Sequence, residues 1–115
     1  LGNGKQEKPY LYIDDLIDAI DCIYKETNDK INYYNVAANS VTTVKEIVNI
    51  LLNKLSLGAT KIQYTGEDRG WVGDVPKFKY DLSKISNLHW QPTMSSNQAV
   101  ALSIDKELQY RKKNS

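Results

Sequence analysis

Short segments typical of β-strands alternate with longer segments typical of amphipathic helices along this chain of 115 residues. Aromatic and β-branched residues suit strands at 10–13, 31–36 and 61–64, and lysines alternate with aromatic side chains over 77–80. Apolar residues recur at helical spacing over 15–26, 43–57 and 96–112, and 82–85 suggests a further helical turn. We therefore expect about four helices and three to four short strands.

Local signals also predict the start of two of these helices and the end of one. Thr43 and Glu46 have the capping-box spacing, in which the hydroxyl and the carboxylate satisfy each other's backbone donors at a helix start. Gly58 stands where a helix needs a left-handed terminator, so we expect this helix to end near residue 57. Asp14 or Asp15 is expected to cap the first helix, a role more common at a helix start than a catalytic carboxylate pair.

The charge balance and the cysteine content exclude several classes of function. Fifteen basic and fourteen acidic residues nearly cancel, so no field of the whole molecule favours nucleic acid or anionic lipid as a partner. No apolar run approaches the roughly 20 residues of a membrane span. Cys22 and His89 are the only residues of their kinds, which leaves no cysteine-histidine metal cluster. A reducing cytoplasmic location fits best.

Catalytic signals are sparse. Cys22 lies among the acidic residues of the first predicted helix, which oppose thiolate formation, so a structural thiol is the better interpretation. His89 has no serine or cysteine motif beside it and is interpreted as a surface imidazole. No glycine-rich phosphate fingerprint is present. We expect no catalytic residue in this chain.

The best binding candidates lie in a glycine-punctuated loop over 65–76 and in the turn near the first residues. Arg69 suits bidentate phosphate recognition, and an ion pair with Glu67, Asp68 or Asp74 is an equally good explanation for it. Trp71 is interpreted first as a buried loop anchor and second as an exposed stacking group. Gln6 and Lys8 would offer an amide and a point charge.

Five segments in this order resemble one family, the extended short-chain dehydrogenases. They are residues 2–16, 34–36, 43–47, 69–76 and 81–85, and the fourth reads Arg-Gly-Trp-Val-Gly-Asp-Val-Pro. More narrowly, the chain is similar to the C-terminal part of NAD-dependent sugar-nucleotide epimerases and dehydratases, with UDP-glucose 4-epimerase as the nearest activity. Lys8 stands where the family commonly has arginine, and Trp71 stands at the spacing where many members have one.

The resemblance implies an α/β fold of Rossmann type in which residues 1–115 are the C-terminal substrate-binding portion. It implies a nucleotide sugar, most simply a UDP-sugar, as substrate, with contacts from Gln6, Lys8, Arg69, Trp71 and Asp74. The NAD site and the catalytic Y-x-x-x-K motif would belong to an N-terminal Rossmann half outside this chain. The alternatives are a dehydratase or reductase of the same family, or a module that only binds a ligand.

The resemblance also concerns two features that could mislead. Tyr80 and Lys84 repeat the spacing of the Y-x-x-x-K motif but lie in a part of the family used for packing. Residues 33–36 resemble a strand that family members insert into the sheet of the Rossmann half. In the chain by itself this strand would be an exposed edge, so a homo-oligomer is expected to form through it.

We predict that NAD does not bind to this chain by itself, because the dinucleotide cradle of the family would lie outside it. Calorimetric titration tests this directly. A saturable heat at micromolar NAD would contradict the prediction.

Overall fold

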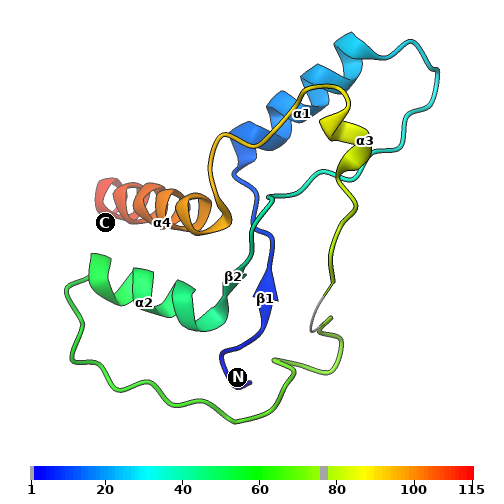
Figure 1. Ribbon diagram of the computed structural model, residues 1–115. Helices are drawn as coiled ribbons and strands as arrows, with labels where there is room; N and C mark the ends of the chain where they lie inside the picture. The colour runs from blue at the N-terminus through cyan, green and yellow to red at the C-terminus, as the bar shows by residue number, and fades with distance from the viewer. Residues whose placement is uncertain (1, 76–77) are drawn as a thin grey trace.

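The computed structural model describes residues 2–75 and 78–115. Its helices lie around a short two-stranded β-sheet, which we call the ribbon (Figure 1). The elements, in chain order, are β1 (Glu7–Lys8), α1 (Ile13–Glu26), β2 (Thr42–Thr43), α2 (Val44–Lys54), α3 (Ser83–Ser86) and α4 (Ser96–Lys113). The α/β class and the four helices are thus confirmed, with α3 and α4 close to their expected ranges.

The sheet is smaller than the sequence predicts. β1 and β2 pair antiparallel, with Glu7 opposite Thr43 and Lys8 opposite Thr42, and they are the only strands in the described part of the chain. The strands expected at 10–13, 31–36 and 61–64 are absent. Strand propensity reflects a fit to a pleated surface, and here no neighbouring strand supplies the ladder. Ile31 and Tyr33 are 70% and 79% exposed, as an edge would be.

The capping box of α2 is confirmed, whereas its predicted end is wrong. The Glu46 amide donates to Thr43 Oγ1 at 3.2 Å, and the Thr43 amide donates to Glu46 Oε2 at 2.7 Å. The helix ends at Lys54, and the left-handed conformation falls on Ser56, with φ 57°, instead of on Gly58. The chain thus turns before it reaches the glycine, by a local geometry less common for serine.

The predicted aspartate cap of α1 is also wrong. Tyr12 is the N-cap residue, and its side chain makes no capping hydrogen bond. Asp15 is buried three residues after this N-cap, where its carboxylate accepts from the Thr93 amide at 3.1 Å and the Thr93 hydroxyl at 2.7 Å. A tertiary contact over 78 positions therefore uses the carboxylate that the local pattern assigned to a cap.

A buried cluster of hydroxyl groups joins the ribbon to α4. Thr42 and Ser96 are both fully buried, and their hydroxyl oxygens lie 2.6 Å apart. The Thr42 hydroxyl donates to Asn97 Oδ1 at 2.6 Å, and the Tyr10 amide donates to Ser96 Oγ at 3.0 Å. The Ser96 amide in turn donates to Ser40 Oγ at 2.9 Å. These hydrogen bonds thereby connect the ribbon and the segments beside it to the start of α4.

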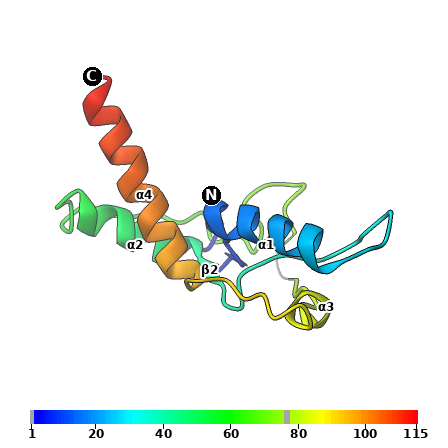
Figure 2. The same ribbon diagram turned by 90° about the horizontal axis from the view of Figure 1, so that it is seen from above.

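Apolar packing is divided between two regions. Ala19 of α1, Ile85 of α3 and Trp90 form the buried cluster, and the partly buried Cys22 packs against it. The Cys22 thiol lies 3.7 Å from the Leu88 carbonyl oxygen, in agreement with a structural role. α2 instead packs against α4, beside the ribbon (Figure 2).

The chain is open and leaves apolar surface uncovered. Its radius of gyration is 17.0 Å, whereas a compact domain of this length has about 13 Å. Ile13, Ile17, Ile20 and Tyr24 follow one another at helical spacing on α1 and are 55%, 58%, 58% and 83% exposed. We call these four residues the α1 stripe. None of the helices in the described residues has the length and apolar character that crossing a membrane requires.

We predict that Thr42→Val lowers the free energy of unfolding by about 1–3 kcal/mol, because it leaves the buried hydroxyl partners of Thr42 without their bond. Urea denaturation measures the change. Thr60→Val removes a hydroxyl at an exposed position and should be close to neutral. Equal stabilities for the two variants would contradict the role assigned to the hydroxyl cluster.

Candidate functional site

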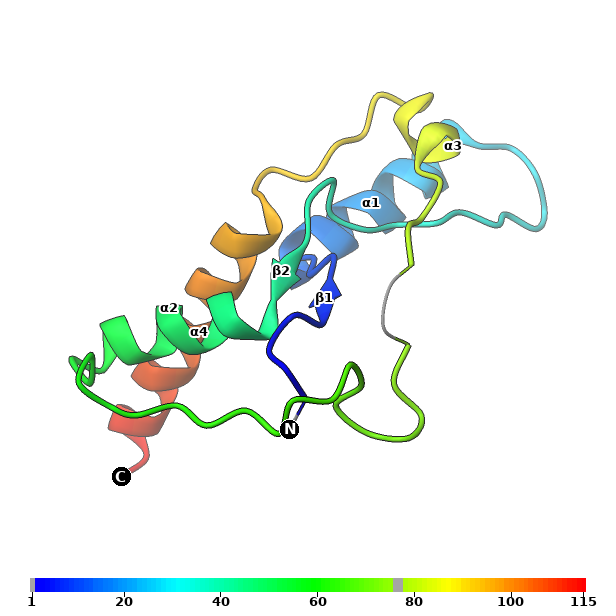
Figure 3. The ribbon, with the colours of Figure 1, turned by 60° about the horizontal axis from the view of Figure 1, so that its bottom comes forward.

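The glycine-punctuated loop lies against the first residues of the chain (Figure 3). We call residues 65–75 the arginine loop. The Gly2 amide donates to Thr65 Oγ1 at 2.6 Å, and the amides of Thr65 and Gly66 donate to the Gly2 carbonyl at 3.0 and 3.2 Å. Asn3 Nδ2 donates to Asp68 Oδ1 at 2.8 Å. Residues more than 60 positions apart therefore form one local structure.

Gly4 allows the first turn to fit between two neighbours. Its φ of 78° lies in the left-handed region, and a Cβ placed there would collide with the Tyr64 ring. Its carbonyl accepts from the Lys45 amide at 3.0 Å, at the start of α2. The turn is thus held by α2 on one side and by the residue before the arginine loop on the other.

An ion pair closes the far end of the arginine loop. Lys8 Nζ lies 3.1 Å from Asp74 Oδ1, with the lysine side chain 41% exposed and the aspartate side chain 6% exposed. The Gly70 amide donates to Asp74 Oδ2 at 3.3 Å. The hydrogen bond from Lys8, followed by the one from Gly70, holds the pKa of Asp74 below its ordinary value. Asp74 therefore connects the arginine loop to β1 through Lys8 and closes the loop internally through Gly70.

Arg69 and Trp71 occupy the exposed side of this loop. No residue in the described part of the chain forms an ion pair with Arg69. Spacing offered it three acidic partners, Glu67, Asp68 and Asp74, and the last of these pairs with Lys8. Trp71 is 66% exposed, with its indole over Gly73, so the preference for a buried anchor is wrong. A guanidinium and an indole are thus presented to solvent on one loop.

Gln6 is held beneath the arginine loop. It is only 6% exposed, and its Nε2 donates to the carbonyls of Asp68 at 3.0 Å and Glu67 at 3.4 Å. Its Oε1 is buried and has no hydrogen-bond partner among the described residues. The sequence placed Gln6 with Lys8 as a polar group of one turn, and it gave no sign that the amide faces inward.

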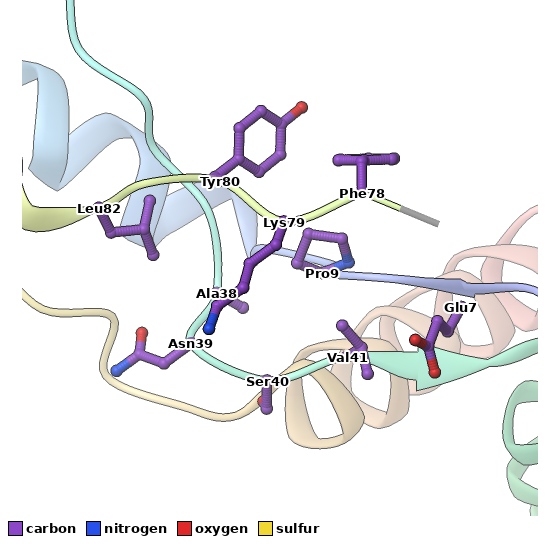
Figure 4. Close-up of a pocket in the computed structure, with 10 residues that line it drawn as sticks. All are labelled: Glu7, Pro9, Ala38, Asn39, Ser40, Val41, Phe78, Lys79, Tyr80 and Leu82. Carbon is purple, nitrogen blue, oxygen red and sulfur yellow. The ribbon is translucent and has the colours of Figure 1, made fainter. Parts of the chain in front are cut away.

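A pocket of about 260 Å³ lies on the other face of β1 (Figure 4). Successive residues of a strand point to opposite faces, so Glu7 and Pro9 line the pocket while Gln6 and Lys8 face the arginine loop. Phe78 and Tyr80 form an edge-to-face pair with ring centroids 5.1 Å apart. The other lining residues are Ala38, Asn39, Ser40, Val41, Lys79 and Leu82.

The sequence reasoning missed this pocket, although one signal was present. Phe78 and Tyr80 alternate with lysines, and we interpreted the alternation only as a short extended segment. Ser40 and Val41 come from the segment before β2, 37 or more positions away, and nothing local indicates that they meet the aromatic pair. Among the described residues no group of histidine, cysteine and acidic side chains could hold a metal ion.

The comparisons with known proteins find similarity in three-dimensional structure. No family model and no curated protein matches the sequence. A UDP-glucose 4-epimerase from Thermotoga maritima, solved with UDP-glucose, is 25% identical, with a TM-score of 0.75 over 100% of this chain and 35% of its own. A UDP-galactose 4-epimerase is also 25% identical, with a TM-score of 0.72 over 92% of this chain and 35% of its own.

A third solved structure adds a ligand and a cofactor. It is a UDP-glucuronic acid 4-epimerase mutant from Bacillus cereus in complex with UDP-4-deoxy-4-fluoroglucuronic acid and NAD, 25% identical, with a TM-score of 0.69 over 94% of this chain. The chain spans about a third of the length of each of these structures. It has the fold of a fragment of UDP-sugar 4-epimerases.

We predict that acid loosens the arginine loop through Asp74. A carboxyl group whose pKa is lowered on folding contributes stability above its unfolded value of about 3.9, and loses that contribution as the pH falls through the folded value. Unfolding free energies of the wild type and of Asp74→Asn should therefore differ by a constant amount above about pH 5 and converge as the pH falls through the lowered folded value. Asp29→Asn, which removes the same charge at an exposed position beyond α1, is the control. A difference between wild type and Asp74→Asn that stays constant as the pH falls through this value would contradict this role.

Proposed function

We propose that this chain is the substrate-binding portion of an NAD-dependent nucleotide-sugar epimerase, with UDP-glucose 4-epimerase as the nearest activity. The observation that carries the proposal is the similarity over 100% of the chain to the epimerase solved with UDP-glucose, at a TM-score of 0.75. The order of the five motifs supports the same family. The substrate would be a UDP-sugar, the class of ligand in two of the solved structures.

The arginine loop offers the chemistry that a diphosphate needs. The Arg69 guanidinium has no carboxylate partner among the described residues, so it can form two parallel hydrogen bonds with a phosphate group. The Lys8 ammonium is partly exposed, and besides its bond to Asp74 it has further N–H donors that can meet a phosphate oxygen. Trp71, exposed on the same loop, gives a flat surface on which a sugar or a base can stack.

The pocket beside Phe78 and Tyr80 suits one ring of such a ligand. At about 260 Å³ it lies below the roughly 300–1,000 Å³ of pockets that enclose whole ligands, so it can take a ring but not a complete nucleotide sugar. The aromatic pair supplies apolar contact, and Asn39 and Lys79 supply polar groups. Because the pocket and the arginine loop lie on opposite faces of β1, a single ligand would reach both only by passing around the edge of that strand.

The reaction itself belongs to the rest of the enzyme. NAD, when bound there, would take a hydride from a sugar carbon and return it. The contribution of this chain is to bind and orient the substrate, which places a reacting carbon correctly without any proton transfer from these residues. The α1 stripe is evidence for a further domain that packs on this helix, because four large exposed side chains on one helix face favour burial against another protein surface. That domain would be the nucleotide-binding half.

A thermal-shift panel tests the nucleotide class. UDP-glucose and UDP-glucuronic acid should raise the melting temperature more than GDP-, dTDP- or ADP-sugars at equal concentration, because a ligand that binds only the folded chain stabilises it by mass action. Equal shifts with every nucleotide sugar, or none with any, would contradict the proposal.

We predict that Arg69→Ala weakens UDP-glucose binding by about 10- to 100-fold, which corresponds to the roughly 1.5–3 kcal/mol of a charge-assisted hydrogen bond. Arg69→Lys should recover part of the loss, because an ammonium cannot form the paired contact. Calorimetry gives the affinities, and the melting temperature should stay unchanged.

The chain offers a matched control for this prediction. Arg111, the only other arginine, lies exposed on α4 and bonds Glu107. Arg111→Ala removes the same charge and should leave the affinity for UDP-glucose as it is. If Arg69→Ala lowers the melting temperature and keeps the wild-type affinity, then Arg69 is a structural residue.

A further inference from the structure

We propose that Gln6 is a positioning residue of the arginine loop, which fixes the direction of Arg69 and does not itself contact the substrate. The effect on ligand affinity rests on the proposed function, whereas the effect on the loop stands on the geometry of this chain alone. The proposal assigns a role to a buried amide that sequence and family resemblance place among the substrate contacts.

Gln6 holds the loop directly before Arg69. Its Nε2 donates to the carbonyls of Asp68 and Glu67, the two residues that precede the arginine. Each peptide group is planar, so fixing two successive carbonyls fixes the orientation of the backbone that enters Arg69. With Asp74 held by Lys8, the stretch from 67 to 74 is anchored at both ends.

The burial of Gln6 makes it the stronger of the two anchors near Asp68. The other contact there, from Asn3 Nδ2 to Asp68 Oδ1, lies at the exposed surface, where water competes for the same groups. Gln6 is 6% exposed, so its two donors have no solvent alternative. Gly2 provides the room, because a Cβ at that position would collide with the Gln6 amide.

The unpaired oxygen of the same amide points to a functional use of this residue. A buried Oε1 without a partner is a cost to the fold, and an apolar side chain of similar volume would avoid it. Only the two donors offset this cost, and both of them hold the loop. Removing the amide should therefore loosen the loop more than it destabilises the chain.

The sharpest test replaces Gln6 with Met, which has a similar size and cannot donate, or with Glu, which cannot donate while its carboxyl group is ionised. In Gln6→Met and Gln6→Glu, backbone amide order parameters over 67–73 should fall from about 0.85 to below about 0.6, while those of α4 stay unchanged. The indole resonance of Trp71 should shift and that of the buried Trp90 should not. Binding of UDP, measured by calorimetry, should weaken about tenfold.

Gln109, an exposed residue on α4, supplies the matched controls Gln109→Met and Gln109→Glu, which should change none of these readouts. A folded Gln6→Met variant with an ordered loop would overturn the proposal, even if its melting temperature falls. If the Gln6 variants do not fold, hydrogen exchange in the wild-type chain tests the proposal instead. The side-chain amide protons of Gln6 should exchange with solvent at least tenfold more slowly than those of Gln109. Equal exchange rates would overturn the proposal.

The two proposals fail in different ways. A wild type that does not bind UDP, together with a loop that loosens in Gln6→Met, would count against the proposed function and support the positioning role. Unchanged loop order and unchanged UDP affinity in Gln6→Met would leave the proposed function standing and remove Gln6 from it.

Discussion

The hydrogen bond between the Thr42 and Ser96 hydroxyls is the contact on which the arrangement of this chain depends. Both side chains are fully buried, and the bond joins the ribbon to the first turn of α4. Apolar packing is divided between the cluster of α1, α3 and Trp90 and the contact of α2 with α4. The buried hydroxyl cluster lies between these two regions and connects them. The Ser96 hydroxyl also bonds the end of β1, through the Tyr10 amide and the Lys8 carbonyl. Along this segment alternate residues face opposite ways, Gln6 and Lys8 to one face and Glu7 and Pro9 to the other. The loop and the pocket are therefore placed on opposite sides of the same two-residue strand.

The candidate site separates the groups that hold the loop from those that are offered to a ligand. Gln6 and Asp74 are buried and make their contacts within the chain, while Arg69 and Trp71 are exposed. Lys8 pairs with Asp74, and the Arg69 guanidinium has no internal carboxylate partner among the described residues. A free cation on a loop anchored at both ends needs little reorganisation to meet a phosphate, and preorganisation of this kind favours affinity.

The open form of the chain agrees with its similarity to about a third of each UDP-sugar 4-epimerase. The α1 stripe and residues 31–36, of which Tyr34 and Val36 are partly buried, lie in the part of the chain away from α2 and α4 (Figure 1). Aromatic and β-branched residues at 31–36 have the composition of a strand but lack a ladder among the described residues. Their strand propensity needs a neighbouring strand before it can take effect.

The sequence by itself determined the helices and the start of α2, because capping and apolar periodicity act over a few residues. The Thr43 box is an example, and the box from Ser95 to Gln98 at the start of α4 has the equivalent Ser-x-x-Gln spacing. Only the tertiary structure decided that Lys8, and not Arg69, pairs with Asp74, that Gln6 faces inward, and that Phe78 and Tyr80 meet Val41 across a pocket. These choices join residues 37 to 66 positions apart, so no local pattern contains them, and the fold selects each partner by burial and distance.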